Sequence, residues 1–147
     1  KNRGFYLDLL SLYNFIQKKD YQYPSTPSIP HMHALDYQLD YILNKEGLEN
    51  RFARHIELAE VVRAWGRKYF ELLPEDKYLS NTVTTIKNTR NIDVAALNKE
   101  LGERGFQISN GYGSLKGKTF RIAHMADCQM EDIQELLSNI NDILGLE

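Results

Sequence analysis

Residues Gly117–Met125 read GKTFRIAHM, and this stretch decides what kind of fold the chain can form. Its centre alternates in the way that is typical of a strand, so Phe120 and Ile122 are expected to point to one side of a sheet. Thr119 and Arg121 are then expected to point to the other side. An arginine at such a position either pairs with a surface carboxylate or is available to bind an anion. The residue pattern alone favours the two equally.

The segments around this strand alternate between strand and helix patterns. Ser80–Asn88 is rich in β-branched residues and predicts a strand, and Phe106–Ser109 predicts a short one. Asp93 is placed to cap a helix that closes near Gly105. The expected buried residues of that helix are Ala96, Leu97 and Leu101. A final amphipathic helix is expected over Met130–Leu144. The order β-α-β-β-α indicates an α+β fold, with a small antiparallel sheet covered on one face by helices.

Two helices are expected before this module. Ser28 fits the N-cap of the first helix and Pro30 one of its early positions. The apolar stripe of this helix is Met32, Leu35, Leu39 and Ile42. Gly47 is expected to end it, because glycine readily adopts the conformation that closes a helix. The second helix is expected over residues 48–73, apolar on more than one face and therefore packed on two sides, and ended by Pro74.

The segment before these helices is rich in proline. Proline fixes its own φ and disfavours helix in the residue before it, so Tyr23–Ser28 is expected to be extended and non-helical. Further upstream, Phe5–Ile16 has a mixed apolar period that fits the end of a strand running into a short helix.

Composition limits the classes of function. The chain has 147 residues, with 18 Lys and Arg against 20 Asp and Glu, a net charge of −2, and 42% hydrophobic residues. A charge so near zero argues against binding to nucleic acid or to a membrane surface, since both attract clustered cations. Cys128 has no second cysteine to pair with, which fits a reducing, cytoplasmic compartment. No apolar run approaches the roughly 20 residues of a membrane span. The chain opens KNRGFYLDLL, without an initiator methionine or a signal-peptide pattern, and we expect it to be part of a longer product.

Several motifs have a plain structural explanation. His31 and His33 are separated by one residue on a helix and lack further ligands, so no metal site is expected. The loop NGYGSLKGK, residues 110–118, leads into a strand rather than a helix, which favours a β-connection with positive φ at Gly111 and Gly113 over a phosphate loop. Cys128 has acidic neighbours and is expected to be unreactive. Arg54 and His55 lie within the long helix, where charge pairing is favoured over catalysis.

Two features suit anion binding. The hydroxyl groups of Tyr23 and Thr26 lie in the proline-stiffened segment, where their directions are fixed. Arg121 carries a planar fork that donates two parallel hydrogen bonds to a carboxylate. A surface loop and a rim ion pair would explain the same residues, and the choice stays open at this point.

Together these residues resemble a known family. The pieces YPSTPSIPHMHAL, EGLENRFARHIELAE, SNTVTTI and ISNGYGSLKGKTFRIAHM are similar to the C-terminal third of class V pyridoxal-phosphate-dependent aminotransferases. The nearest group is the serine–pyruvate and alanine–glyoxylate type. The resemblance covers nearly the whole chain, from Phe5 to the last helix.

The resemblance implies roles for three residues. The family's Tyr-x-x-Thr pair reaches across the dimer interface to the cofactor phosphate of the other subunit, and it falls on Tyr23 and Thr26. The family's substrate-carboxylate arginine falls on Arg121. The implied protein is a homodimer that holds pyridoxal 5'-phosphate and moves an amino group between a small amino acid and a 2-oxo acid such as pyruvate or glyoxylate. The implied fold is the small domain of a fold-type I enzyme.

The match has departures and omissions. Ala123 and Ala126 stand where the family phrase usually has glycine, and Asn110 stands where the loop often has another. The lysine that holds the cofactor, the aspartate that pairs with the pyridine nitrogen and the aromatic residue that stacks on the ring are expected upstream. No catalytic residue is therefore assigned within this chain, and the fragment alone is expected to be inactive.

The implied division has three parts. Residues 1–30 would be the remnant of the cofactor domain and a dimer-crossing segment, residues 31–74 the interdomain helices, and residues 75–147 the small domain. Two alternatives remain: a non-catalytic dimerisation or binding module of the same fold, and a phosphonate-transaminase or desulfurase-like relative. The desulfurase would need a nucleophilic cysteine on a mobile loop, whereas Cys128 opens a helix.

Overall fold

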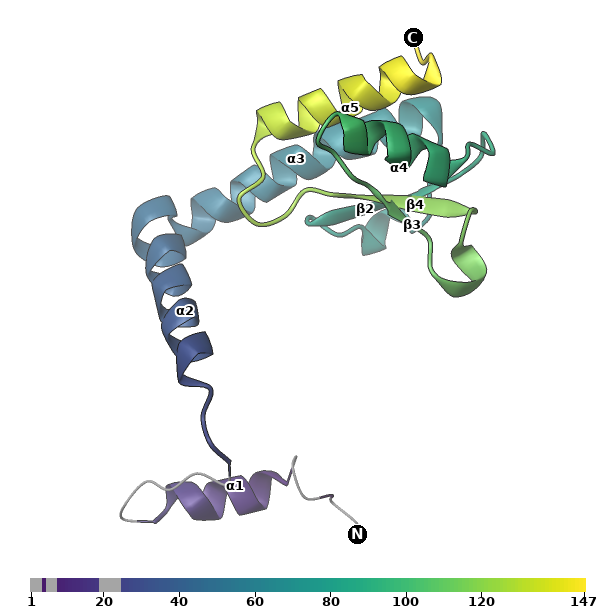
Figure 1. The fold of residues 1–147 in the computed structure, drawn as a ribbon. Helices are drawn as coiled ribbons and strands as arrows, with labels where there is room; N and C mark the ends of the chain where they lie inside the picture. Colours follow the sequence, from purple (N-terminus) through teal and green to yellow (C-terminus); the bar gives the residue numbers. More distant parts are fainter. Residues whose placement is uncertain (1–3, 5–7, 19–24) are drawn as a thin grey trace. The chain divides into compact units, whose positions relative to one another are not determined.

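The computed structural model describes Gly4, residues 8–18 and residues 25–147 (Figure 1). The chain divides into two compact units, residues 1–46 and residues 47–147, and each is described by itself. Within the described residues, no helix is both long enough and apolar enough to cross a membrane.

The described residues of the N-terminal unit include two α-helices. Helix α1, Leu9–Ile16, begins at Asp8, whose carboxylate accepts a hydrogen bond of 3.1 Å from the backbone of Leu10. Helix α2, Ile29–Asp40, follows the N-cap Ser28 with a proline in its first turn, as predicted. It continues as a π-helical turn, η1, over Tyr41–Glu46 and ends before Gly47, which has a φ of +84°. Its predicted apolar stripe is largely exposed within this unit: Met32, Leu35 and Leu39.

The C-terminal unit is an α+β layer structure, which confirms the predicted fold class. Its four strands are β1 (Glu71–Leu72), β2 (Val83–Lys87), β3 (Ser109–Asn110) and β4 (Thr119–Ala123). They form one antiparallel sheet in the order β1-β2-β4-β3. Helices α3 (Leu48–Tyr69), α4 (Val94–Glu103) and α5 (Met130–Leu144) lie on one face of this sheet (Figure 1), and short 3-10 turns, η2 (Asp76–Tyr78) and η3 (Gly113–Leu115), interrupt the connections.

The long helix ends earlier than the sequence pattern predicts. Helix α3 stops at Tyr69 rather than at residue 73, because the backbone of Phe70 is extended. The next two residues form β1, with Glu71 opposite Lys87 in β2. Pairing with a strand satisfies the backbone groups of this segment, and Leu73 continues it with a bond of 3.0 Å to the carbonyl of Thr85.

The short strand β3 is also displaced from its predicted position over residues 106–109. The backbone of Phe106 closes helix α4 by donating to the carbonyl of Leu101. The side chain of Asn98 bonds both backbone groups of Ile108, at 2.8 Å each. Those groups are therefore unavailable to a neighbouring strand. Asp93 caps α4 as predicted, but Ala96, expected to be buried, is exposed.

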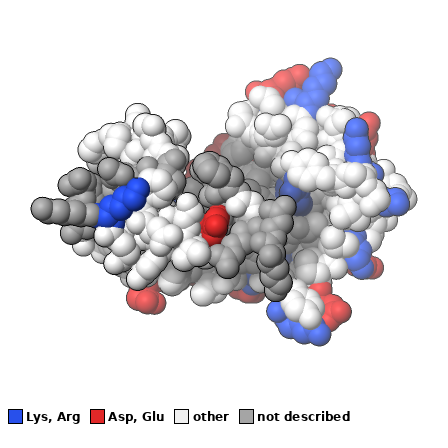
Figure 2. Space-filling view, turned by 90° about the horizontal axis from the view of Figure 1, so that it is seen from below, with Lys and Arg blue, Asp and Glu red and all other residues white. Residues whose placement is uncertain are grey.

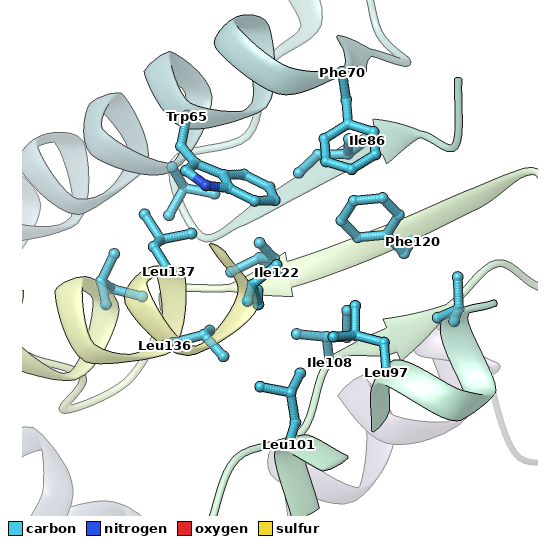
Figure 3. Close-up of a cluster of buried hydrophobic side chains, with 14 of the residues drawn as sticks. Trp65, Phe70, Ile86, Leu97, Leu101, Ile108, Phe120, Ile122, Leu136 and Leu137 are labelled. Carbon is cyan, nitrogen blue, oxygen red and sulfur yellow. The ribbon is translucent and has the colours of Figure 1, made fainter. Parts of the chain in front are cut away.

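The core lies between the sheet and the three helices (Figure 3). Three rings form its centre: the Phe70 centroid is 5.5 Å from that of Trp65 and 5.2 Å from that of Phe120. The indole nitrogen of Trp65 donates to the side chain of Asn141 in α5 at 2.8 Å. Phe120 lies opposite Ile86 across the β2–β4 pair, and both are buried, so this face of the sheet is the core face.

Charges of both signs are interspersed over the described surface. On the face drawn in Figure 2, blue Lys and Arg side chains lie singly, with red Asp and Glu side chains among them. This distribution agrees with the net charge of −2 over the whole sequence.

Candidate functional site

Arg121 lies at the middle of β4, on the sheet face opposite the core. Its neighbour across β2 is Thr85 and its neighbour across β3 is Ser109. Side chains alternate along a strand, so Arg121 points away from the helices while Phe120 and Ile122 point into the core. This is the arrangement that the alternation of residues 119–122 predicts.

The guanidinium of Arg121 is not held by an ion pair. Among the described residues, no carboxylate lies within salt-bridge distance of it, and its Nε is buried without a hydrogen-bond partner. One terminal nitrogen donates to the carbonyl of Asn110 at 3.5 Å, the outer limit of a hydrogen bond. Its Cζ lies 4.3 Å from the ring centroid of Tyr112. The plainer explanation, a rim ion pair, is therefore not what the described residues form.

The loop before β4 is closed by its own polar groups. The side-chain oxygen of Asn110 accepts from the backbone of Gly111 at 2.8 Å and from that of Gly117 at 2.9 Å. The side-chain nitrogen of Asn88, which follows β2, donates to the carbonyl of Gly117 at 2.8 Å. Gly113 and Gly117 have positive φ, as glycines in such a connection do.

Gly111 differs from the expectation that it would need a positive φ. Its φ is not positive, and its requirement is space. A Cβ built on Gly111 would lie 2.2 Å from the carbonyl oxygen of Leu115 and 2.5 Å from the hydroxyl of Thr119. Close approach of the two backbone segments therefore demands glycine here.

The other two predicted site residues belong to the N-terminal unit. Tyr23 lies outside the described residues. Thr26 is exposed and non-helical, and no hydrogen bond to its side chain is found among the described residues. Its hydroxyl is thus available to a ligand such as a phosphate. Nearby, the hydroxyl of Ser28 bonds His31 at 2.6 Å at the start of α2.

The segment after β4 is anchored to α3. Arg54 donates to the backbone carbonyls of Ala126, at 2.9 Å, and Cys128. These contacts give Arg54 the structural role that was favoured over catalysis, and its partners include backbone groups of another segment. Ala126 has a φ of +59°, a conformation that favours glycine. Burial raises the pKa of the Cys128 thiol, and the carboxylate of Asp132 raises it further, which supports the prediction that this cysteine is unreactive.

A buried polar cluster lies where sequence analysis assigned no function. His124 is 0% exposed, and its Nε2 bonds the hydroxyl of Thr84 at 2.9 Å. Burial lowers the pKa of His124, and the nearby Arg63 and His55 lower it further, against the opposing effect of backbone hydrogen bonds. Among the described residues, His124 Nδ1 and His55 Nε2 are buried and have no hydrogen-bond partner in good geometry. The sequence pattern indicated only charge pairing for His55 and no role for His124, because no local pattern shows that the two residues lie close together.

Several known proteins are similar to this chain in sequence. No protein-family model matches the chain. An uncharacterized aminotransferase of Methanocaldococcus jannaschii is 36% identical over 137 residues, which cover 92% of this chain and 35% of that protein. Serine–glyoxylate aminotransferase of Arabidopsis thaliana is 34% identical over 128 residues, 83% of this chain and 31% of that protein.

Solved structures agree with the sequence comparison. The aspartate aminotransferase of subgroup IV from Thermus thermophilus superposes with a TM-score of 0.79 at 25% identity, over 99% of this chain and 40% of that one. The chain thus spans about a third of the length of the curated relatives it matches, at 35% and 31%.

Proposed function

Because the chain matches, in sequence and in fold, a C-terminal portion of the class V pyridoxal-phosphate-dependent aminotransferases, we propose that it supplies part of the substrate site of such an enzyme. The full-length protein then transfers an amino group between a small amino acid and a 2-oxo acid. The main support for this proposal is that Arg121, on the sheet face opposite the core, forms no ion pair with any described carboxylate.

Arg121 binds the α-carboxylate of the substrate. A guanidinium presents two parallel N–H donors that match a carboxylate, and each charge-assisted bond is stronger than a neutral one. Placement in the middle of β4 fixes the base of the side chain between two neighbouring strands. A substrate held at its carboxylate by two bonds is fixed in rotation, so its Cα–H bond keeps a constant direction toward the reacting group.

The cofactor is pyridoxal 5'-phosphate, held mainly by residues outside this chain. When bound, its ring supplies the electron sink for breaking the Cα–H bond. Thr26 fits a phosphate ligand because its hydroxyl is exposed and has no partner among the described residues. Tyr23 and Thr26 would donate to the phosphate bound by the neighbouring subunit, so the enzyme would be a homodimer in which the segment that carries these two residues crosses the interface.

The substrates are inferred from the names of the relatives. Glyoxylate is named as a substrate of the serine–glyoxylate aminotransferase of Arabidopsis thaliana and of an L-aspartate–glyoxylate aminotransferase of Paracoccus denitrificans. Pyruvate is named as a substrate of a pyridoxamine–pyruvate transaminase of Mesorhizobium japonicum. Both are small 2-oxo acids, and both carry the carboxylate that Arg121 would bind. We therefore assign the chain to an enzyme that uses pyruvate or glyoxylate as acceptor.

A second candidate differs in the amino donor. A relative named 2-aminoethylphosphonate–pyruvate transaminase, from Bacillus cereus, is 32% identical over 143 residues. Such a donor has no α-carboxylate, because its phosphonate is attached one carbon further from the amine, while pyruvate still carries a carboxylate. Activity with 2-aminoethylphosphonate that exceeds activity with alanine and serine would favour this candidate.

The proposal is tested by comparing the full-length protein with the present chain. Each is incubated with pyridoxal phosphate and with one of three pairs that give a new amino acid: alanine with glyoxylate, serine with glyoxylate, or serine with pyruvate. The new amino acid is quantified by chromatography. Transfer by the full-length protein and none by the chain alone is expected. No transfer by a folded, cofactor-loaded full-length protein with any of these pairs would favour the non-catalytic module.

A further inference from the structure

Tyr112 is an exposed aromatic residue beside the proposed carboxylate site. Its side chain is 75% exposed, among the highest values for a large apolar residue in the described chain. One face of its ring nevertheless contacts Arg121, whose Cζ atom lies 4.3 Å from the ring centroid. A cation over the face of a tyrosine ring is attracted by the electrons of the ring.

The loop that carries Tyr112 fixes the position of this ring. Asn110 closes the loop through bonds to the backbone of Gly111 and Gly117. The carbonyl of Tyr112 itself accepts from the backbone of Leu115 at 3.0 Å, at the start of η3. The backbone on both sides of Tyr112 is therefore specified by hydrogen bonds, and its side chain starts from a defined point over β4.

The way in which Arg121 is held matters for what it can bind. An ion pair would orient the guanidinium but would occupy the donors that a carboxylate needs. Contact with a ring restrains one face of the guanidinium and leaves its in-plane N–H donors unused. The bond of Arg121 to Asn110, at 3.5 Å, engages a single nitrogen weakly.

We infer that Tyr112 is a positioning residue for Arg121, holding the guanidinium by ring contact so that its hydrogen-bond donors stay available to the substrate carboxylate. This inference rests on the proposed function, since it assigns Tyr112 a role through Arg121. Tyr112 acts on substrate binding rather than on the chemical step. The aromatic ring of Tyr112 carries this role, and its hydroxyl group does not contribute.

The test uses five variants of the full-length enzyme, each assayed for KM and kcat with an amino acid and a 2-oxo acid. Tyr112→Leu keeps a large apolar side chain but removes the ring, and Tyr112→Phe keeps the ring. Arg121→Gln removes the charge, and the double variant combines it with Tyr112→Leu. Tyr78→Ala is the matched control. Tyr78 is also exposed and also has a cation over its ring, in this case Lys77, whose Nζ lies 4.9 Å from the ring centroid.

Tyr112→Leu is expected to raise KM for both substrates about two- to fivefold, the effect of one exposed cation–ring contact, with little change in kcat. Tyr112→Phe is expected to restore the wild-type KM, and Tyr78→Ala to leave it unchanged. In the Arg121→Gln background, Tyr112→Leu is expected to raise KM no further, because the cation it positions is gone.

Three results would overturn the inference, and they can be told apart. If Arg121→Gln raises KM but Tyr112→Leu matches the wild type, Tyr112 does not position the arginine and the proposed function stands. If Arg121→Gln leaves KM unchanged, the proposed function fails and this inference fails with it. Equal KM increases from Tyr112→Leu in both backgrounds would show a general effect on the fold and would also overturn the inference.

Discussion

Replacing Gly111 by alanine should destabilise the loop that prepares Arg121, because the added methyl group has no space. Its Cβ would lie 2.2 Å from the carbonyl oxygen of Leu115 and 2.5 Å from the hydroxyl of Thr119. To make room, the loop must shift and weaken the bond of 2.9 Å from Gly111 to the carbonyl of Thr119 and the bond of 2.8 Å to Asn110. Overpacking costs about 1–3 kcal/mol and each of the two weakened hydrogen bonds about 0.5–1.5 kcal/mol, so we expect a loss of about 2–6 kcal/mol.

Alanine substitutions at two other glycines give reference values for the change in the free energy of unfolding. Gly113 has open space around its Cβ position but a φ of +53°, so Gly113→Ala should cost only about 1 kcal/mol of backbone strain. Gly102, inside α4, has open space and no positive φ, so Gly102→Ala should stabilise by about 0.5–1 kcal/mol. Urea unfolding of the chain, followed by circular dichroism and extrapolated to water, measures all three free energies. If Gly111→Ala cost no more than Gly113→Ala, the close approach of this loop to β4 would be refuted.

Three further outcomes are expected. Burial lowers the pKa of His124, so the unfolded chain binds more protons than the folded chain at acidic pH. The contribution of His124 to the free energy of unfolding should therefore be constant above about pH 6.5 and fall as the pH drops below that value. Urea titrations at several pH values should show a smaller fall for His124→Gln. Ala126→Gly should be neutral to stabilising by about 1 kcal/mol because it relieves a φ of +59°, whereas Ala123→Gly, on extended backbone, should cost about 0.5–1 kcal/mol; thermal melts showing the reverse order would contradict the assigned conformations. In the full-length enzyme, Tyr23→Phe with Thr26→Val should weaken cofactor binding by about 1.5–3 kcal/mol per lost bond. A mixed dimer can pair one such subunit with a subunit that lacks the cofactor lysine but keeps Tyr23 and Thr26. The one site with an intact lysine should then bind the cofactor with normal affinity. Equal loss in that hybrid would place the contact within one subunit.

The C-terminal unit could be largely predicted because its signals are local. Asp93 lies at the start of α4, where its side chain accepts the capping bonds that the sequence predicts, and the final helix over Met130–Leu144 has the predicted bounds. The alternation in residues 119–122 also gave the correct face for Arg121. Each of these follows from the period or the chemistry of a few neighbouring residues.

The features that were missed depend on contacts between distant segments. Strand β1 has only two residues, Glu71 and Leu72, and it exists because β2 pairs with them, so no periodic pattern could show it. The requirement for glycine at position 111 comes from the approach of Leu115 rather than from φ. The ring of Tyr112 reaches Arg121 only because the loop is folded back over β4.

The contribution of Arg121 to carboxylate binding is the central claim, and one comparison tests it most directly. In the full-length enzyme, Arg121→Lys keeps the charge but loses the fork, so one of two parallel hydrogen bonds is lost and the substrate can rotate. We expect kcat/KM for amino acids to fall by about 10²- to 10⁴-fold, or roughly 3–5 kcal/mol of transition-state binding. Amines without a carboxylate should react as poorly with the variant as with the wild type, because they never contact the arginine. An equal loss of kcat/KM for both kinds of amine would show that Arg121 supports the fold rather than the substrate, and would contradict the account.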